Sequence, residues 1–146
     1  MESIIDKKNI RVRQKAMDWK EAIRAAGVVL EAQGSITPAY TASMIAAVEE
    51  LGPYIVIMPG IAIAQAAPSA AVLREDIALI TLESPVRFGS PNDPVSVILC
   101  VACADRDSHV RALQRVALAL DDEDIIERMA NATTEKELYD ILHHAS

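Results

Sequence analysis

Apolar residues in the first third of the chain recur every three or four positions, which is the spacing of one helix face. The first such stretch runs from Asp18 to Gln33, and Asp18 is placed to cap the helix, with Glu21 three residues later. A second stretch opens at Thr37-Pro38 and ends at Gly52-Pro53. We therefore predict a helical hairpin. Its apolar stripes are Trp19, Ala22, Ile23, Ala26 and Leu30 in the first helix and Met44, Ala47, Val48 and Leu51 in the second.

The middle of the chain changes to short apolar runs that are separated by turn residues. Pairs and clusters of glycine, proline and serine mark turns at 59–60, 68–69, 84–85 and 89–94. Strands that are apolar on both faces need helices on both sides of their sheet. The predicted strands are Tyr54–Met58, Ile61–Gln65, Ile77–Leu82 and Val95–Cys103.

The last third returns to helical spacing. The apolar run that ends near Ala104 leads directly into a helix capped by Asp105–Ser108, and a strand that feeds a helix in this way is typical of a largely parallel sheet. We interpret the acidic cluster Asp121–Asp124 as the charged start of a short helix rather than as a metal site. Thr134 and Glu137 form a capping box for the final helix. We expect one α/β domain over residues 1–146, without internal repeats or linkers.

The charge of the chain narrows the classes of partner. Its 146 residues include 21 acidic and 14 basic side chains, a formal net charge of −7, and only 3% are aromatic. Such a chain lacks the phosphate-seeking surface that nucleic-acid binding needs, so we exclude nucleic acid as a partner. The first 20 residues are the exception, with six basic and three acidic side chains. We interpret residues 1–16 as a basic leader and residues 17–143 as the core.

The hydropathy of the chain and its two cysteines indicate where in the cell the protein is expected. The longest apolar run, Val95–Ala104, has ten residues, whereas a membrane-spanning helix needs about 18. We expect a cytoplasmic protein without membrane insertion. Cys100 and Cys103 are three positions apart in a predicted strand, so their side chains point to opposite faces and cannot grip one metal ion together. We expect buried thiols, no metal site and no cofactor.

The three histidines are the first candidates for chemistry. His143 and His144 lie in the last turn of the final helix, where a cation complements the helix dipole, and we interpret them as surface residues. His109 lies in the first turn of its helix, on the same side as Leu113 and Val116, and should face the sheet. One interpretation is an inward histidine bonded to a backbone carbonyl. The other is a site at the ligand-binding edge of an α/β sheet, beside the anion-attracting end of a helix.

Three blocks of the sequence are distinctive in their order and spacing: Leu51–Ile63 (LGPYIVIMPGIAI), Ser84–Val95 (SPVRFGSPNDPV) and Asp107–Leu113 (DSHVRAL). In these blocks the chain resembles the enzyme IIA components of the bacterial phosphotransferase system, in the type 2 mannitol/fructose superfamily and most closely its ascorbate-type branch. The likeness extends from about Asp18 to Ile141. It implies a mixed, roughly five-stranded β-sheet with helices on both sides, and a phosphocarrier role in sugar transport.

The resemblance also implies partners. Enzyme IIA proteins receive a phosphoryl group from the histidine-containing phosphocarrier protein and pass it to a cognate enzyme IIB. We therefore expect both proteins as partners of this chain. The sequence leaves the sugar and the oligomeric state open, a homodimer included.

One position departs from the family pattern in a way that changes the expected chemistry. Where the block after P-G-I-A normally carries the phospho-acceptor histidine, this chain has Gln65. An imidazole keeps a lone pair on a neutral ring nitrogen, whereas the carboxamide nitrogen of glutamine has its lone pair delocalised into the carbonyl. Gln65 therefore cannot serve as that nucleophile, whether the substitution is natural or engineered.

The surroundings of Gln65 depart from the pattern as well. Ascorbate-type relatives usually carry an arginine two residues further on, and this chain has Ala67. No Lys or Arg occurs between Ala25 and Leu73, although phosphoryl transfer depends on electrostatic stabilisation of the transferred group. The resemblance assigns His109 to orienting or stabilising the phosphorylated imidazole. Gly60, Ala67 and Ser108 complete the expected site as binding positions.

Three hypotheses follow. In the first, the chain keeps the docking surface of an enzyme IIA but has lost the phospho-acceptor, and acts as a regulator or silent competitor. In the second, His109 has become the acceptor and phosphotransfer continues. In the third, the scaffold is an anion or small-molecule binding module built on the turn at Gly60 and the helix start near His109. A tolerated polar residue without a role is the remaining interpretation of Gln65.

Overall fold

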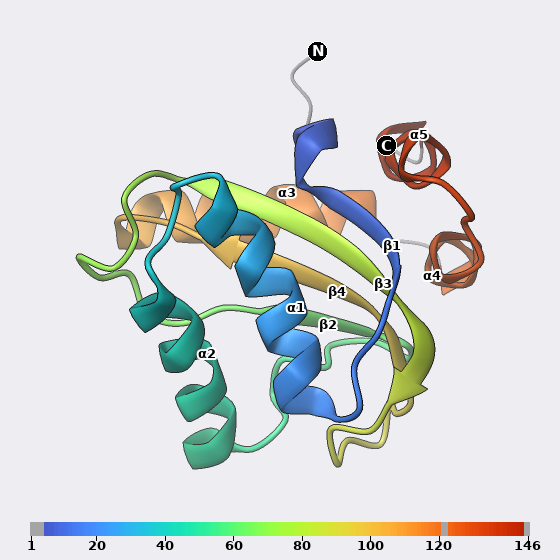
Figure 1. The fold of residues 1–146 in the computed structure, drawn as a ribbon, viewed down its shortest axis with the longest axis horizontal. Coiled ribbons are helices and arrows are strands. Elements are labelled where there is room, and N and C mark those ends of the chain that lie inside the picture. Colours follow the sequence, from blue (N-terminus) through green and yellow to red (C-terminus); the bar gives the residue numbers. More distant parts are fainter. Residues whose placement is uncertain (1–4, 121–122, 145–146) are drawn as a thin grey trace.

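In the part of the chain that the structure describes, four strands form one mixed β-sheet in the order β1-β3-β4-β2. The computed structural model describes residues 5–120 and 123–144, and Figure 1 shows the strands crossing the molecule between two groups of helices. The strands are β1 (Ile10–Gln14), β2 (Ile61–Ala64), β3 (Asp76–Val86) and β4 (Val95–Ala102). The helices are the 3-10 helix η1 (Lys7–Asn9) and α1 (Trp19–Ala32), α2 (Pro38–Leu51), α3 (Arg106–Ala119), α4 (Glu123–Ala130) and α5 (Glu135–His144).

The pairing of the strands combines both directions. β1 runs parallel to β3, β2 runs parallel to β4, and the central pair β3 and β4 is antiparallel. Because β3 and β4 are joined by a hairpin, the two parallel pairs lie on either side of it. The expected mixed α/β sheet is confirmed. The expectation of a largely parallel sheet is wrong for the central pair.

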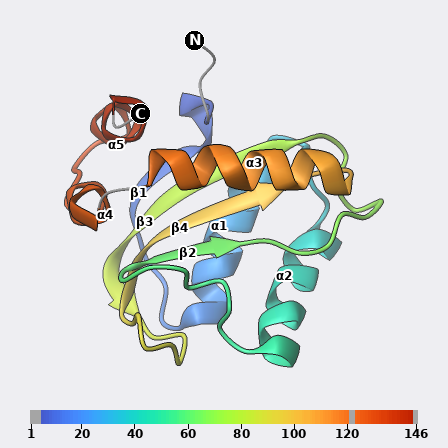
Figure 2. The same ribbon diagram turned by 180° about the vertical axis from the view of Figure 1, so that it is seen from behind.

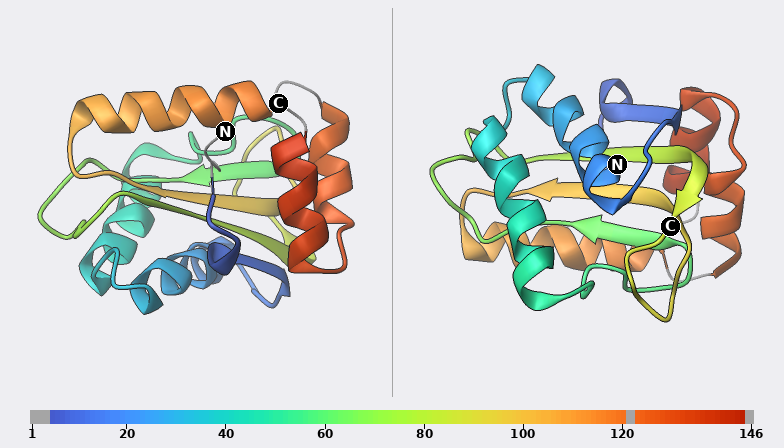
Figure 3. Two further views of the ribbon diagram at one scale, coloured as in Figure 1. Left: turned by 90° about the horizontal axis from the view of Figure 1, so that it is seen from above. Right: turned by 60° about the horizontal axis from the view of Figure 1, so that its bottom comes forward.

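Helices cover both faces of the sheet. Figure 3 shows α3 on one side and α1 and α2 on the other, with α4 and α5 beside one end of the strands. Two buried clusters match these layers, since one contains residues of α1 and α2 and the other contains residues of α3, α4 and α5. Cys100 belongs to the first cluster and Cys103 to the second, and both thiols are free and buried. The prediction that the two cysteines face opposite sides is confirmed.

The sheet has one strand fewer than expected at the edge beyond β2. Tyr54–Met58 forms a turn and an irregular segment rather than a strand. The segment still lies along β2, because the backbone N–H of Ile63 donates to the carbonyl of Ile55 at 2.9 Å and that of Ile61 donates to Met58 at 3.2 Å. Pro53 and the turn after it leave too few residues in register for a strand.

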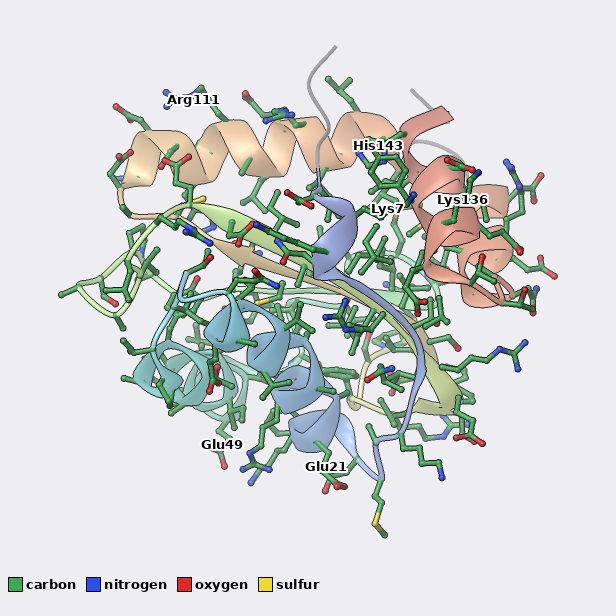
Figure 4. The ribbon with its side chains drawn as sticks, turned by 45° about the horizontal axis from the view of Figure 1, so that its top comes forward. Lys7, Glu21, Glu49, Arg111, Lys136 and His143 are labelled. Carbon is green, nitrogen blue, oxygen red and sulfur yellow. The ribbon has the colours of Figure 1, made fainter. Side chains whose placement is uncertain are left out.

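The first residues contain a strand and not only a leader. β1 falls inside residues 1–16, where Ile10 pairs with Leu79 and Arg11 with Ile80 of β3. The segment before it packs on α5, since the Ile5 N–H lies 3.4 Å from the acceptor Nε2 of His143. The ring of His143 stacks on the ring of Tyr139, and the ammonium group of Lys7 lies over the Tyr139 ring (Figure 4). The interpretation of residues 1–16 as a solvated basic leader is therefore wrong for residues 5–14.

Most predicted helix starts are confirmed by their caps. The Asp18 carboxylate accepts from the Glu21 N–H, the Asp105 carboxylate from the Ser108 N–H and the Thr134 hydroxyl from the Glu137 N–H. Thr37 occupies the N-cap position of α2, but its side chain makes no cap hydrogen bond. In the acidic cluster Asp121–Asp124, residues 121 and 122 lie outside the described residues.

The structure of residues 5–120 and 123–144 bears on membrane insertion and on metal binding. None of the helices there is long and apolar enough to span a lipid bilayer. Within the same ranges, no group of three or more His, Cys, Asp or Glu side chains is arranged to hold a metal ion.

The central sheet should dominate stability. Leu99 of β4 has no exposed surface and lies in the cluster beneath α3, whereas the side chain of Leu118 on α3 is 73% exposed. We expect Leu99→Ala to lower the free energy of unfolding by about 2–5 kcal/mol, because it removes buried methyl groups and leaves a cavity. Leu118→Ala should change it by less than about 0.5 kcal/mol. Urea unfolding of both variants checks this, and equal effects would contradict the assigned core.

Candidate functional site

The candidate site lies where β2 ends and α3 begins. Because β2 and β4 are parallel, with Ala64 paired with Cys100, both strands end at the same edge of the sheet. β4 then leads through a short connection into α3, which runs back over the sheet (Figure 2). Gln65 directly follows β2, and His109 lies in the first turns of α3. Two residues that are 44 positions apart therefore meet at one edge.

Gln65 and His109 are joined by a side-chain hydrogen bond between the carboxamide oxygen Oε1 and the ring nitrogen Nε2. A carboxamide oxygen has no proton, so His109 Nε2–H is the donor. The carboxamide nitrogen of Gln65 lies 3.5 Å from the carbonyl of Ile63, to which it donates. Both side chains are half-buried. His109 points inward, as the first interpretation expects, but its hydrogen-bond partner is the side chain of Gln65 and not a backbone carbonyl.

The start of α3 carries its own anion. The Asp105 carboxylate caps the helix by accepting from the Ser108 N–H at 2.9 Å, and this bond lowers the pKa of Asp105. Ser108 is buried, and its hydroxyl donates to the Asp105 carbonyl at 3.1 Å. The same hydroxyl contacts Cys103, where burial first and the nearby charge of Glu75 second raise the pKa of the thiol to about 11. Cys103 is therefore a neutral core thiol and not a nucleophile.

Tyr40 positions the backbone beside Gln65. Its hydroxyl is fully buried, accepts from the Ala66 N–H at 3.1 Å and lies 2.9 Å from the acceptor carbonyl of Val101 in β4. α2 thereby ties the residue after Gln65 to the central sheet. Sequence reasoning missed this role, although Tyr40 shares a helix face with the buried Met44 four residues later, so that its hydroxyl had to find a partner inside the protein.

The far end of the segment after β2 is also held. The N–H groups of Leu73 and Arg74 both donate to the Ser35 carbonyl, at 2.8 and 3.2 Å, and the Ser35 hydroxyl donates to Asp76 at 2.6 Å. Between these anchors, Ala67 is exposed. Ala67 is thus on the surface two residues from Gln65, at a position that can take a longer side chain.

Gly60 lies at the other end of β2. It precedes the strand, so about 16 Å of extended chain separates it from Gln65. Its φ of 87° suits glycine, and a Cβ there would lie 3.2 Å from the Ile126 side chain of α4. The hollow beside it is lined by residues that include Asn92, Asp93 and Glu127. Gly60, one of the expected binding positions, therefore lies at the opposite end of β2 from Gln65, whereas Ala67 and Ser108 are sequence neighbours of Gln65 and His109.

Comparisons with known proteins agree with this architecture. The family model described as "Phosphoenolpyruvate-dependent sugar phosphotransferase system, EIIA 2" matches residues 3–145. The ascorbate-specific PTS system EIIA component of Escherichia coli K12 is 30% identical over 143 residues, covering 97% of this chain and 93% of that protein. The mannitol-specific cryptic phosphotransferase enzyme IIA component of the same strain is 33% identical over 134 residues, covering 92% and 91%.

A solved complex is similar as well. It contains the mannitol enzyme IIA of Escherichia coli together with phosphorylated mannitol enzyme IIB. The matched chain superposes with a TM-score of 0.83 at 30% identity, covering 96% of this chain and 97% of that one.

Removing the Tyr40 hydroxyl should loosen the site. Tyr40→Phe leaves the buried Ala66 N–H without its partner, so we expect the free energy of unfolding to fall by about 1–3 kcal/mol. Tyr54→Phe is the matched control, because Tyr54 is 46% exposed, and it should change stability by less than about 0.5 kcal/mol. Urea unfolding measures both, and a neutral Tyr40→Phe would contradict the anchoring role.

The same residue predicts a dependence on alkaline pH. Burial raises the pKa of Tyr40, so the unfolded chain loses this proton at lower pH than the folded chain does. The stabilisation is complete below the ordinary tyrosine pKa of about 10 and is lost as pH rises beyond it. The stability difference between wild type and Tyr40→Phe should therefore shrink as pH rises above about 10. Cys100, Cys103 and Tyr54 are present in both proteins, and a difference that stays constant above about pH 10 would refute the assignment.

Proposed function

Because the chain belongs to the EIIA type 2 family of the phosphoenolpyruvate-dependent sugar phosphotransferase system, we propose that it docks onto the partners of that phosphoryl relay without accepting a phosphoryl group itself. Its role is then regulatory: it occupies a surface on a relay partner that an active enzyme IIA would otherwise use. The relatives named ascorbate-specific and mannitol-specific point to a sugar-transport system of one of these two types.

The observation that carries the proposal is the contact between Gln65 and His109. In the family, the resemblance assigns the acceptor role to the histidine at position 65 and the supporting role to His109. The hydrogen bond from His109 Nε2 to Gln65 Oε1 supports this assignment, because His109 reaches the side chain at that position. A carboxamide offers no nucleophilic nitrogen lone pair, so no N–P bond can form there.

The charges around the pair support the same conclusion. Stabilising a phosphoryl group in transfer requires cations or fixed N–H donors directed at its three oxygens. Ala67 supplies neither, and the sequence has no Lys or Arg from Ala25 to Leu73. The helix end at Asp105 is already occupied by that residue's own carboxylate. These features disfavour both His109 as a new acceptor and a general anion-binding module.

The expected partners are an enzyme IIB and the histidine-containing phosphocarrier protein. The enzyme IIB assignment is supported by the mannitol enzyme IIA of Escherichia coli, which is similar over almost the whole chain and was solved with its phosphorylated enzyme IIB. The phosphocarrier assignment is supported by the resemblance of the blocks around Gln65 and His109. Retention of the scaffold around a residue that cannot react is what a docking role requires.

A phosphorylation assay tests the proposal. The chain is incubated with phosphorylated phosphocarrier protein, and its intact mass is measured before and after mild acid. We expect no acid-labile adduct on the wild-type chain. Gln65→His should gain one phosphoryl group, because its imidazole nitrogen forms a new N–P bond as the N–P bond of the donor breaks. Adding Ala67→Arg should raise the labelling rate of Gln65→His by about tenfold or more, through charge stabilisation of the transferred group.

Two results would contradict the proposal. An adduct on the wild-type chain would refute the loss of the acceptor, and its disappearance in His109→Ala would identify His109 as the acceptor instead. Failure of Gln65→His to become labelled, with the variant folded by circular dichroism, would show that position 65 is not the acceptor position.

A further inference from the structure

Most hydrogen-bond donors at the centre of the candidate site are already used. His109 Nε2–H is donated to Gln65 Oε1, and the carboxamide nitrogen of Gln65 donates to the Ile63 carbonyl. Gln65 Oε1 itself can only accept. An incoming phosphoryl group brings three acceptor oxygens, whereas this pair offers it another acceptor and only the second N–H of the Gln65 carboxamide.

The electrostatic field at the same place is also unsuited to a phosphoryl group. The start of α3 would attract an anion, but Asp105 caps it and Asp107 adds a second carboxylate in the first turn. Glu75 lies near enough to raise the pKa of Cys103 beneath the helix start. Arg106 in the same turn and Arg111 offset these charges in part, and the Arg111 side chain extends from the outer side of α3, away from the sheet (Figure 4).

Neutral surface is available for docking on the two segments that carry this centre. Val110 follows His109 and is exposed, and Leu73 on the segment after Gln65 is exposed as well. Ala67 and Ala70 on that segment are small and exposed. Contacts of this kind do not depend on the charge of the partner. A phosphoryl group on the partner, by contrast, adds a charge of about −1.5 to −2 that this surface does not compensate.

Resting on the proposed function, we infer that this chain discriminates between the two states of its enzyme IIB partner and binds the unphosphorylated form more tightly than the phosphorylated form. It then withholds the form of enzyme IIB that still needs a phosphoryl group, and releases the form that has one. The expected preference is about tenfold or more, because a single phosphoryl oxygen left without a donor costs about 1–3 kcal/mol and about 1.4 kcal/mol is a factor of ten.

The experiment measures two dissociation constants by isothermal titration calorimetry. The full chain is titrated with ascorbate-type and mannitol-type enzyme IIB proteins, each in the unphosphorylated and the phosphorylated form. The phosphorylated forms are prepared with an active enzyme IIA, which is removed before the titration. We expect binding of one type, with a dissociation constant about tenfold or more lower for the unphosphorylated form. The ratio should shrink as salt is raised, because screening weakens the repulsion.

Charge variants separate this explanation from a change in fold. Ala67→Arg should bind phosphorylated enzyme IIB more tightly and leave the affinity for the unphosphorylated form within about twofold. Ala42→Arg adds the same charge at an exposed position on α2 and should change neither affinity. Because both alanines are exposed, both variants should fold.

The outcomes distinguish the two proposals. Equal affinity for both forms, or tighter binding of phosphorylated enzyme IIB, would overturn the inference and leave the docking function standing. Binding of neither form by either type would overturn the docking function and the inference with it. A preference that Ala67→Arg does not reduce would show that charge at the site is not its cause.

Discussion

The parallel pairing of β2 with β4 is the constraint on which the candidate site depends. Parallel strands end at the same edge of a sheet, and β4 leads into α3 almost without a connection. The residue after β2 and the first turns of α3 are therefore brought together by the backbone alone. The hydrogen bond between Gln65 and His109 follows from this arrangement, and so does the proximity of Asp105, whose cap fixes the start of the helix.

A glutamine at position 65 changes the chemistry at this edge of the sheet but not its geometry. A glutamine carboxamide and a histidine imidazole reach a similar distance from the backbone and can both make hydrogen bonds, so the fold accepts either at position 65. Only the imidazole can form a bond to phosphorus. A single substitution can therefore preserve the shape that a partner recognises while it removes the reaction. The capped helix start and the missing cations then determine which charge state of a partner fits that shape.

Much of the fold could be predicted from the sequence, because capping residues mark where its helices begin. Asp18, Asp105 and Thr134 are caps in the sequence pattern and in the structure. β1 was missed because Arg11 and Arg13 give its segment the composition of a solvated leader, although Ile10 is fully buried. The apolar composition of Tyr54–Met58 predicts a strand, but the turn that follows Pro53 takes up part of this segment and breaks its register. The role of Tyr40 depends on distances across the fold, which periodicity alone does not give, whereas the separation of Gly60 from Gln65 already follows from the predicted strand Ile61–Gln65.

The anchoring of the segment after β2 has a consequence for how such a surface can change. Tyr40 fixes the backbone at Ala66, and Ser35 fixes it again at Leu73 and Arg74. Val72 packs into the buried cluster with α1 and α2, but the stretch 67–70 before it contributes no residue to the core. Its length and side chains can therefore vary widely while position 65 keeps its register against α3, which lets recognition evolve separately from the frame that supports it.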